Sequence, residues 1–256
     1  MAEAVRTRDV IETGPRHTPA DVIRLNTRFA NAAPADLLRA ALIERLTGRT
    51  AVVSSFGAES AVLLHMVASI DPATPVIFLD TLKHFPETLA YRDQLTERLG
   101  LTDVRTIRPD AERLAARDAT ELRWSYDPDG CCEIRKVQPL TRALADFDAT
   151  VSGRKGFQSA TRTHIPSFEM DTSDAAGRIK VNPLAGWTKA DLDAYFEAHD
   201  LPRHPLEAEG YPSIGCSPCT SVVQEGEDSR AGRWRGWDKV ECGIHTPAEG
   251  PNQPSF

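Results

Sequence analysis

Five cysteines are the residues of this chain with the clearest capacity for chemistry. Two are adjacent, two are separated by two residues and one stands alone: Cys131 and Cys132, Cys216 and Cys219, and Cys242. A Cys-x-x-Cys pair commonly binds zinc or an iron–sulfur cluster, and adjacent thiolates can ligate different irons of one cluster. An odd number of cysteines makes a poor disulfide framework. The spacing predicts a metal centre on four cysteines, with iron–sulfur favoured over zinc; buried, inert thiols are the alternative.

A basic stretch precedes the single cysteine. Residues 230–239 carry four basic side chains and one acidic one, in a chain whose formal net charge is −7. This local reversal of sign predicts an anionic ligand, with Arg230 and Arg233 as its candidate partners. Cations lower the pKa of a nearby thiol, so Cys242 is a candidate nucleophile, with His245 beside it. A solvated basic face with a spectator cysteine is the alternative.

A short loop rich in serine follows the first predicted strand. Small, hydroxylated residues there leave backbone N–H groups free at the start of a helix, where an anion is favoured. The Gly-Lys-Ser/Thr ending of a Walker loop is absent. The loop therefore predicts a phosphate site of another kind, or a tight turn with a serine N-cap. Its candidate residues are Ser54, Ser55, Phe56, Gly57 and Ser60.

Polar side chains also follow two other strands. An acidic residue at a strand end is placed to contact a ribose or a base, and arginines can hold a phosphate or sulfate through two hydrogen bonds. Simple caps and solvated arginines are the alternatives. These candidates are Asp80 and Thr81 after one strand, and Gly153, Arg154 and Arg162 after another. Lys136, one helical turn after Cys132, could offset the charge of metal-bound thiolates.

The elements that must position these residues alternate along the chain. Buried strands interleaved with helices predict βαβ units, and hence an α/β fold in which helices cover both faces of a mostly parallel sheet. Ligands in such sheets lie at the carboxyl ends of the strands. We expect strands at 50–56, 75–80, 103–108 and 148–153, and helices at 35–46, 59–69, 85–100 and 188–200.

One domain is expected over residues 20–245. Residues 1–19 and 246–256 lack periodicity, so both are expected to be flexible. Regular patterns fade after about residue 200, which predicts an irregular C-terminal fifth. Within it, we expect a mobile segment at about 228–245 to carry the nucleophile.

Composition excludes several classes of protein. A net charge of −7 argues against broad binding of nucleic acid, which needs a basic surface. No apolar run approaches the roughly 18 to 20 residues of a membrane span. The first residues lack the apolar region of a signal peptide. A cytoplasmic location is expected.

Seven segments together resemble the assimilatory adenylylsulfate reductases of the phosphoadenylylsulfate reductase family, within the PP-loop nucleotide-binding superfamily. The resemblance extends over roughly residues 30 to 245. The loop departs from the superfamily form S-G-G-x-D-S, because Phe56 replaces a glycine and Glu59 the aspartate, which puts ATP use in doubt. The segments are SSFGAES, LDTLKHFPET, CCEIRKVQPL, SGRKGFQSATR, KVNPLAGWTKADL, GYPSIGCSPCT and ECGIH.

The resemblance implies reduction of adenosine 5′-phosphosulfate to sulfite and AMP through an S-sulfocysteine on Cys242. It implies a [4Fe–4S] cluster on Cys131, Cys132, Cys216 and Cys219, linked to substrate by Lys136. It implies that Arg154, Arg162, Arg230 and Arg233 bind the phosphosulfate. Thioredoxin, or a glutaredoxin-like dithiol, is the implied partner, and a homo-oligomer is left open.

Three other functions compete with this interpretation. A reductase of the 3′-phosphorylated substrate is one, although the four-cysteine set accompanies the unphosphorylated form within the family. A PP-loop ATP pyrophosphatase, such as a tRNA-thiolating enzyme, is the second, and the acidic net charge disfavours it. A metal-binding redox sensor is the third, and it leaves the arginines and the serine loop unexplained.

Overall fold

A six-stranded sheet forms the centre of the molecule. The computed structural model describes residues 16–158, 165–174 and 176–244. The strand order is β3-β2-β1-β4-β6-β5, and neighbouring strands run parallel except for β5, which is antiparallel to β6. The expected α/β fold with a mostly parallel sheet is thus confirmed. The strands are β1 (Thr50–Val53), β2 (Val76–Leu79), β3 (Val104–Ile107), β4 (Ala149–Ser152), β5 (Phe168–Met170) and β6 (Ile179–Val181).

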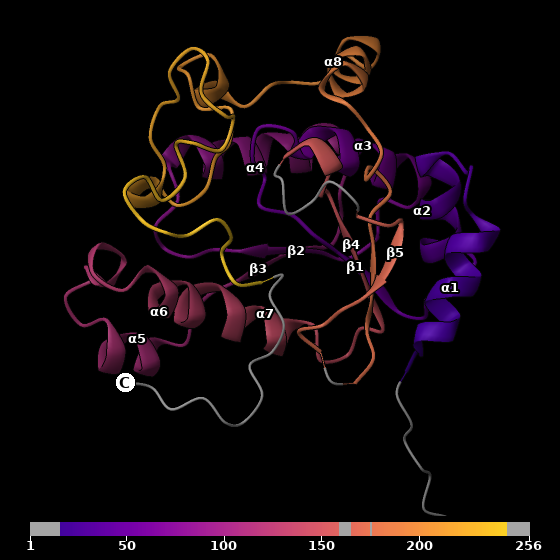
Figure 1. Cartoon of the computed structure of the whole chain (residues 1–256), viewed down its shortest axis with the longest axis horizontal. Helices are drawn as coiled ribbons and strands as arrows, with labels where there is room; N and C mark the ends of the chain where they lie inside the picture. The colour runs from indigo at the N-terminus through magenta and orange to yellow at the C-terminus, as the bar shows by residue number, and fades with distance from the viewer. Residues whose placement is uncertain (1–15, 159–164, 175, 245–256) are drawn as a thin grey trace, which may run out of the picture.

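Helices cover both faces of the sheet (Figure 1). On one side lie α3 (Ser60–Ile70), α4 (Pro86–Leu99) and, farther out, α8 (Lys189–Ala198). On the other side lie α5 (Ala111–Arg117), α6 (Pro128–Cys132) and α7 (Gln138–Ala143). At one end of the sheet, α1 (Pro19–Arg28) contacts β5 and α2 (Pro34–Leu42) contacts α3.

The central strands are buried because helices cover them on both sides. Every residue of β2 and of β4 is buried, and α3 is apolar around most of its circumference. A large cluster joins α3 and α4 to one face of the sheet, with Val52, Leu64 and Phe78 at its centre. A smaller cluster, which includes Ile77 and Leu144, lies against the opposite face.

Several boundaries differ from those expected. The domain begins before residue 20, because a capping box on Thr18 starts α1 at Pro19. The helix expected at 35–46 ends at Leu42, and Arg45 then adopts a left-handed φ of 53°. The strand expected at 50–56 ends at Val53, since the chain turns into the serine loop. Of the ends expected to be flexible, residues 1–15 and 246–256 lie outside the described residues.

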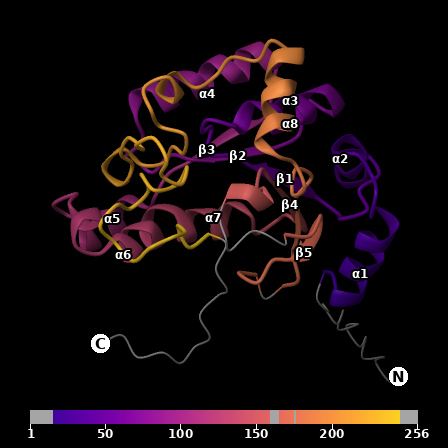
Figure 2. The same ribbon diagram turned by 45° about the horizontal axis from the view of Figure 1, so that its top comes forward.

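The chain after α8 is irregular, as the fading periodicity predicted. Between residues 201 and 244 the structure contains short 3₁₀ turns, η5 (Pro205–Glu207) and η6 (Ser217–Cys219), but no α-helix or strand. This segment crosses one edge of the molecule between α4 and α6 (Figures 1 and 2). Ile214 and Trp234 anchor it, because both side chains are buried. None of the described helices is both long and apolar enough to cross a membrane.

Candidate functional site

A pocket opens at the carboxyl ends of β1, β2 and β4. Strand order reverses between β1 and β4, so this is the switch point at which ligands bind in open α/β sheets. The cavity volume is about 250 Å³, and its wall combines strand ends with the irregular C-terminal segment. Eleven of the residues expected at the site line it together: Ser54, Ser55, Gly57, Ser60, Thr81, Lys136, Gly153, Arg154, Arg230, Arg233 and Cys242.

The serine loop forms one wall of this pocket. The side-chain oxygen of Ser54 accepts a hydrogen bond of 3.2 Å from the backbone N–H of Phe56. Phe56 has a φ of 49° and a fully buried side chain, which packs edge-on against Phe78 at 5.5 Å. The Phe56 side chain therefore packs into the core and stabilises the turn. It does not line the pocket, whereas Ser54, Ser55 and Ser60 do.

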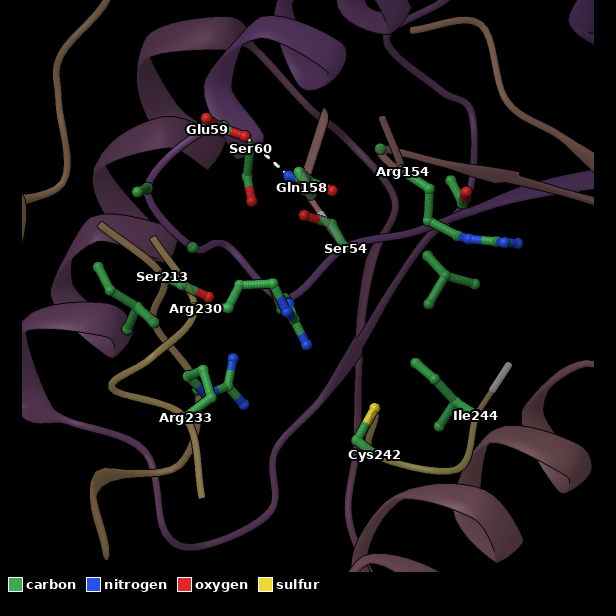
Figure 3. Close-up of a pocket in the computed structure, with 18 of the residues that line it drawn as sticks. Ser54, Glu59, Ser60, Arg154, Gln158, Ser213, Arg230, Arg233, Cys242 and Ile244 are labelled. Carbon is green, nitrogen blue, oxygen red and sulfur yellow. Dashed lines mark hydrogen bonds between the residues drawn. The ribbon is translucent and has the colours of Figure 1, made fainter. Parts of the chain in front are cut away.

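An acidic residue stands at the start of α3, inside the same wall. The Glu59 carboxylate accepts hydrogen bonds of 2.8 Å from the ammonium of Lys155 and from the amide of Gln158 (Figure 3). The Lys155 side chain is 3% exposed, so its charge needs this partner. Glu59 and Lys155 were not among the expected site residues, although both lie inside segments that were. Glu59 and Lys155 therefore neutralise each other in this wall of the pocket.

The other end of the pocket is basic and faces Cys242. Arg230 and Arg233 enter from one side, and Cys242 and Ile244 lie on the opposite side (Figure 3). Arg230 donates a hydrogen bond of 2.9 Å to the carbonyl of Val240, two residues before Cys242. The geometry thus places a thiol across a cavity from two guanidinium groups, which suits an anion held between them.

Arg154 lies differently from the other two arginines. Its guanidinium group forms an ion pair with Glu169 on β5 and points away from Arg230 and Arg233 (Figure 3). Two expected residues, Arg162 and His245, lie outside the described residues. Asp80 is absent from the pocket wall, because its carboxylate accepts from the N–H of Leu82 at 3.0 Å and from Arg108 at 2.9 Å.

The four paired cysteines gather beneath the pocket, where α6 meets the 3₁₀ turn η6. All five cysteines are free thiols, and Cys131, Cys132 and Cys216 are buried. Burial raises the pKa of Cys131 and Cys132 to about 11, and thiolate neighbours contribute to this rise. Burial also acts on Cys216, but nearby Lys136 and a hydrogen bond with Thr81 lower its pKa overall.

Lys136 lies between these cysteines and the nucleophile candidate. The chain from Glu133 to Val137 forms a π-helix, a local widening that is frequent at functional sites. Burial alone would lower the pKa of Lys136, but negative charge on Cys216, Cys242 and Cys132 raises it above its ordinary value. The Lys136 side chain also lines the pocket. Its ammonium is therefore a fixed positive charge shared by the cysteine group and the cavity.

The preceding residue, Arg135, secures this arrangement from the core. Arg135 is 3% exposed and pairs at 2.7 Å with fully buried Asp118. It also donates a hydrogen bond of 2.8 Å to the carbonyl of Thr81, whose hydroxyl lies 3.3 Å from the Cys216 sulfur. Arg135 thus fixes the π-helix to the loop after β2.

His84 is another pocket residue that was not anticipated from the sequence. His84 follows β2, packs against Phe78 at 5.0 Å and donates from Nε2 to the carbonyl of Leu79 at 2.8 Å. Because a carbonyl only accepts, Nδ1 is the unprotonated nitrogen. Burial lowers the pKa of His84, which keeps the ring neutral. The sequence signal that could have identified His84 is its position shortly after a buried strand, where ligands bind in such sheets.

The cysteine group was compared with the requirements of a single metal ion. Over the described ranges, no three His, Cys, Asp or Glu side chains are arranged to hold one ion. The paired cysteines nevertheless raise one another's pKa, so the four thiols lie in one region of the fold.

Comparison with known proteins identifies the family. The phosphoadenosine phosphosulfate reductase domain matches residues 49–222, which is more than half of the chain. The chain belongs to this family. The recognition made from the sequence motifs is thereby confirmed. The matched range holds the serine loop, the four paired cysteines and most of the pocket wall, whereas Cys242 follows it.

Relatives in this family are similar over nearly their whole length. An adenosine 5′-phosphosulfate reductase from Chelativorans sp. (strain BNC1) is 49% identical over 91% of this chain and 94% of its own. A phosphoadenosine 5′-phosphosulfate reductase from Gloeobacter violaceus is 41% identical over 86% of this chain and 92% of its own.

Solved structures show the same architecture. The phosphoadenylyl-sulfate reductase of Candida auris, in a phosphate complex, is 27% identical with a TM-score of 0.68, covering 81% of this chain and 98% of that one. The FMN adenylyltransferase of Candida glabrata is 15% identical with a TM-score of 0.50, covering 77% and 69%. The second likeness concerns the fold alone.

Proposed function

We propose that this protein reduces adenosine 5′-phosphosulfate to sulfite and AMP in assimilatory sulfate reduction. The observation that carries the proposal is the placement of Cys242 in one cavity with Arg230, Arg233 and Lys136, beside a serine loop at the switch point of the sheet. Several relatives with 39–49% identity are named adenosine 5′-phosphosulfate reductase, which supports this substrate.

The reaction is a displacement at sulfur in two steps. The Cys242 thiolate attacks the sulfate sulfur, the S–O bond to the phosphate breaks, and AMP leaves with the bond electrons. An S-sulfocysteine remains on the enzyme. A dithiol reductant then attacks the cysteine sulfur, releases sulfite and becomes a disulfide. Both electrons therefore come from the reductant.

The chain's own cations stabilise the charges in these steps. Arg230 and Arg233 lie where the phosphosulfate would face Cys242, so they can bind the departing phosphate. Lys136 approaches from the cysteine group and can stabilise negative charge on the sulfonyl oxygens. Arg162 and His245 stay predictions of the same kind, the first for the phosphosulfate and the second for catalysis.

Cys131, Cys132, Cys216 and Cys219 would hold a [4Fe–4S] cluster. Their gathering beneath the pocket and the buried lysine among them support this assignment. When bound, the cluster supplies a fixed charge and a rigid support rather than net electrons, because the dithiol already provides two. We expect the isolated protein to be brown, with about four irons per chain.

The second thiol must come from another molecule. With four cysteines on the cluster, Cys242 is the only one left to react, so no cysteine of this chain can release the sulfite. Thioredoxin, or a glutaredoxin-like protein, is the proposed reductant. The cytoplasm, where thiols stay reduced, is the compartment that supplies it.

The test combines turnover with mass spectrometry. Protein mixed with adenosine 5′-phosphosulfate and no reductant should gain about 80 Da at Cys242, the mass of SO₃ in a covalent intermediate. Addition of thioredoxin should then release sulfite. The Cys242→Ser variant should show neither result. An unmodified wild-type protein with its metal fully loaded would contradict the proposal.

The 3′-phosphorylated nucleotide provides the second arm of the test. The cysteine set leads us to propose a preference for the unphosphorylated 3′-hydroxyl. The relative from Gloeobacter violaceus, named for the phosphorylated substrate, keeps the other possibility in view. Faster sulfite release from the 3′-phosphate form would reassign the substrate while leaving the chemistry of Cys242 intact.

A further inference from the structure

An ion pair joins two parts of the site that are 110 residues apart in the chain. The ammonium of Lys239 donates to the carboxylate of Asp129. Asp129 lies in α6, two residues before Cys131, and Lys239 lies three residues before Cys242. The pair therefore connects the segment that carries the nucleophile to the helix that carries two paired cysteines.

The two partners differ strongly in exposure. The Lys239 side chain is 6% exposed, whereas that of Asp129 is 80% exposed. An ion pair between two exposed side chains contributes little, but a lysine withdrawn from water depends on the groups that replace its hydration. The exposed position of Asp129 would by itself indicate a weak ion pair. The pair is nevertheless important for Lys239, because this buried ammonium needs a partner in place of water.

An aromatic ring completes the environment of Lys239. Its ammonium lies 5.5 Å from the ring centre of Trp234, close enough for a cation–π interaction. Trp234 is 3% exposed, and its backbone N–H donates a 3.0 Å hydrogen bond to the carbonyl of Cys219. Lys239 therefore rests against a ring that is itself fixed to the second cysteine pair.

Three further contacts hold the same segment on either side of Cys242. Arg230 donates to the carbonyl of Val240 at 2.9 Å and pairs with Glu241 at 3.6 Å, and Ile244 packs against the apolar cluster beneath the sheet. Among these contacts, the ion pair of Lys239 is the one that reaches α6. Neighbouring charges couple Cys132 to Lys136, Cys242 and Lys239, so the ion pair lies close to the centre of the site.

We propose that Lys239 and Asp129 are a positioning pair, which docks the Cys242 segment on α6 so that the thiol faces Arg230 and Arg233. The inference rests on the proposed function of Cys242 and adds two residues that do not line the pocket. When the pair is lost, the arginines keep their places, but the thiol spends less time in the productive position. We expect the turnover number to fall more than the affinity for substrate.

The experiment uses the holoenzyme and five variants. Lys239→Gln and Asp129→Asn each remove the pair, their combination tests coupling, and Lys239→Arg retains a cation. Lys189→Gln is the matched control, because Lys189 pairs with Asp193 at 2.8 Å on the outer helix α8. Hydrogen exchange is measured on the peptide 237–244, and sulfite release is measured with adenosine 5′-phosphosulfate. Iron content is determined for every variant.

Each single loss should speed exchange in this peptide and lower kcat by about tenfold, with KM for the substrate changed by no more than about twofold. The double variant should be no worse than Lys239→Gln, since one shared interaction is lost only once. Lys239→Arg should recover most of the activity, and Lys189→Gln should match wild type in every measurement.

Three results would overturn the positioning pair: unchanged exchange in Lys239→Gln, strictly additive effects in the double variant, or loss of iron that accounts for the loss of activity. Failure of the proposed function is a separate result. A wild-type protein that releases no sulfite would refute the function, whereas the exchange measurement would still test docking of the segment.

Discussion

At the scale of single residues, Cys242 and the four paired cysteines occupy different parts of the site. Cys242 lies at the pocket wall on an irregular segment, whereas the other four lie in or beside α6 and η6 beneath it. The basic side chains are also divided between the cavity and the cysteine group. Arg230 and Arg233 face the cavity, and Lys136 lies between the cavity and the cysteine group.

Arg233 provides a direct test of anion binding. Replacing it with Ala removes a charged hydrogen-bond donor from the pocket, a loss of roughly 1.5–3 kcal/mol, and should lower kcat/KM for adenosine 5′-phosphosulfate by about tenfold to a hundredfold. Arg235→Ala is the control, since Arg235 pairs with Glu227 at 2.8 Å outside the pocket. Steady-state sulfite release measures both. Equal effects of the two changes would contradict a specific role for Arg233.

The sequence could identify eleven of the residues that line the pocket, but not the direction in which each side chain points. Serines after a strand and arginines in an acidic chain are visible as residue types. Phe56 carried no signal that its side chain would turn into the core, because this depends on its left-handed backbone and on Phe78. Asp80 was expected to contact a nucleotide, yet Arg108, which lies beyond β3, pairs with its carboxylate.

At the scale of elements, the strands and helices with a long hydrophobic pattern could be predicted, whereas the shortest strands could not. The alternation of buried strands with helices located β1 to β4 within one to three residues at their ends. The three-residue strands β5 and β6 are too short for periodicity to reveal them. The packing of α6, the π-helix and α7 depends on Arg135 and Asp118, whose pairing is set by the tertiary fold.

This buried pair should stabilise the cysteine-bearing elements. Arg135→Met leaves Asp118 charged and buried without its partner, so we expect the free energy of unfolding to fall by about 3 kcal/mol, or the melting temperature by roughly 6–12 °C. Arg105→Met is the control, because Arg105 pairs with Asp103 in a largely exposed position. Circular dichroism during anaerobic heating measures both. A melting temperature within one degree of wild type would show that the pair is not structural.

At the scale of the whole molecule, the irregular C-terminal segment is attached to the α/β core by buried polar contacts. His204 in this segment bonds to the Thr88 hydroxyl at 3.0 Å and packs against Tyr91 at 4.9 Å, both on α4. Cys242, the proposed nucleophile, and the second cysteine pair therefore belong to the same folded unit as the sheet. Fading periodicity predicted irregular structure, but it gave no indication of these attachments.

Stability should depend on pH through His204. Burial lowers its pKa from 6.5 to about 4, so the unfolded chain binds a proton between these values that the folded chain does not. This contribution to stability is fully present above pH 6.5 and is lost as pH falls toward 4. His204→Gln should show a shallower fall of melting temperature over that range than wild type. Parallel curves would contradict the assignment.

His199→Gln is the control for this measurement. His199 stacks on Tyr195 at 4.2 Å at the end of α8, away from the contact between the C-terminal segment and α4. Its replacement removes an imidazole elsewhere in the fold and so controls for the substitution of a histidine as such. A shallower curve in this variant as well would assign the effect to histidines in general.

The anchoring of Ile244 has a consequence for the speed of the enzyme. Ile244 packs into the cluster beneath the sheet two residues after Cys242, and Lys239 is held three residues before it. On the proposed mechanism a second protein must reach the Cys242 sulfur, which is only partly exposed while the segment is held at both ends. The rate at which one end of the segment detaches then sets an upper limit on the turnover number. A more viscous solvent should therefore lower the turnover number even when substrate and reductant are both saturating.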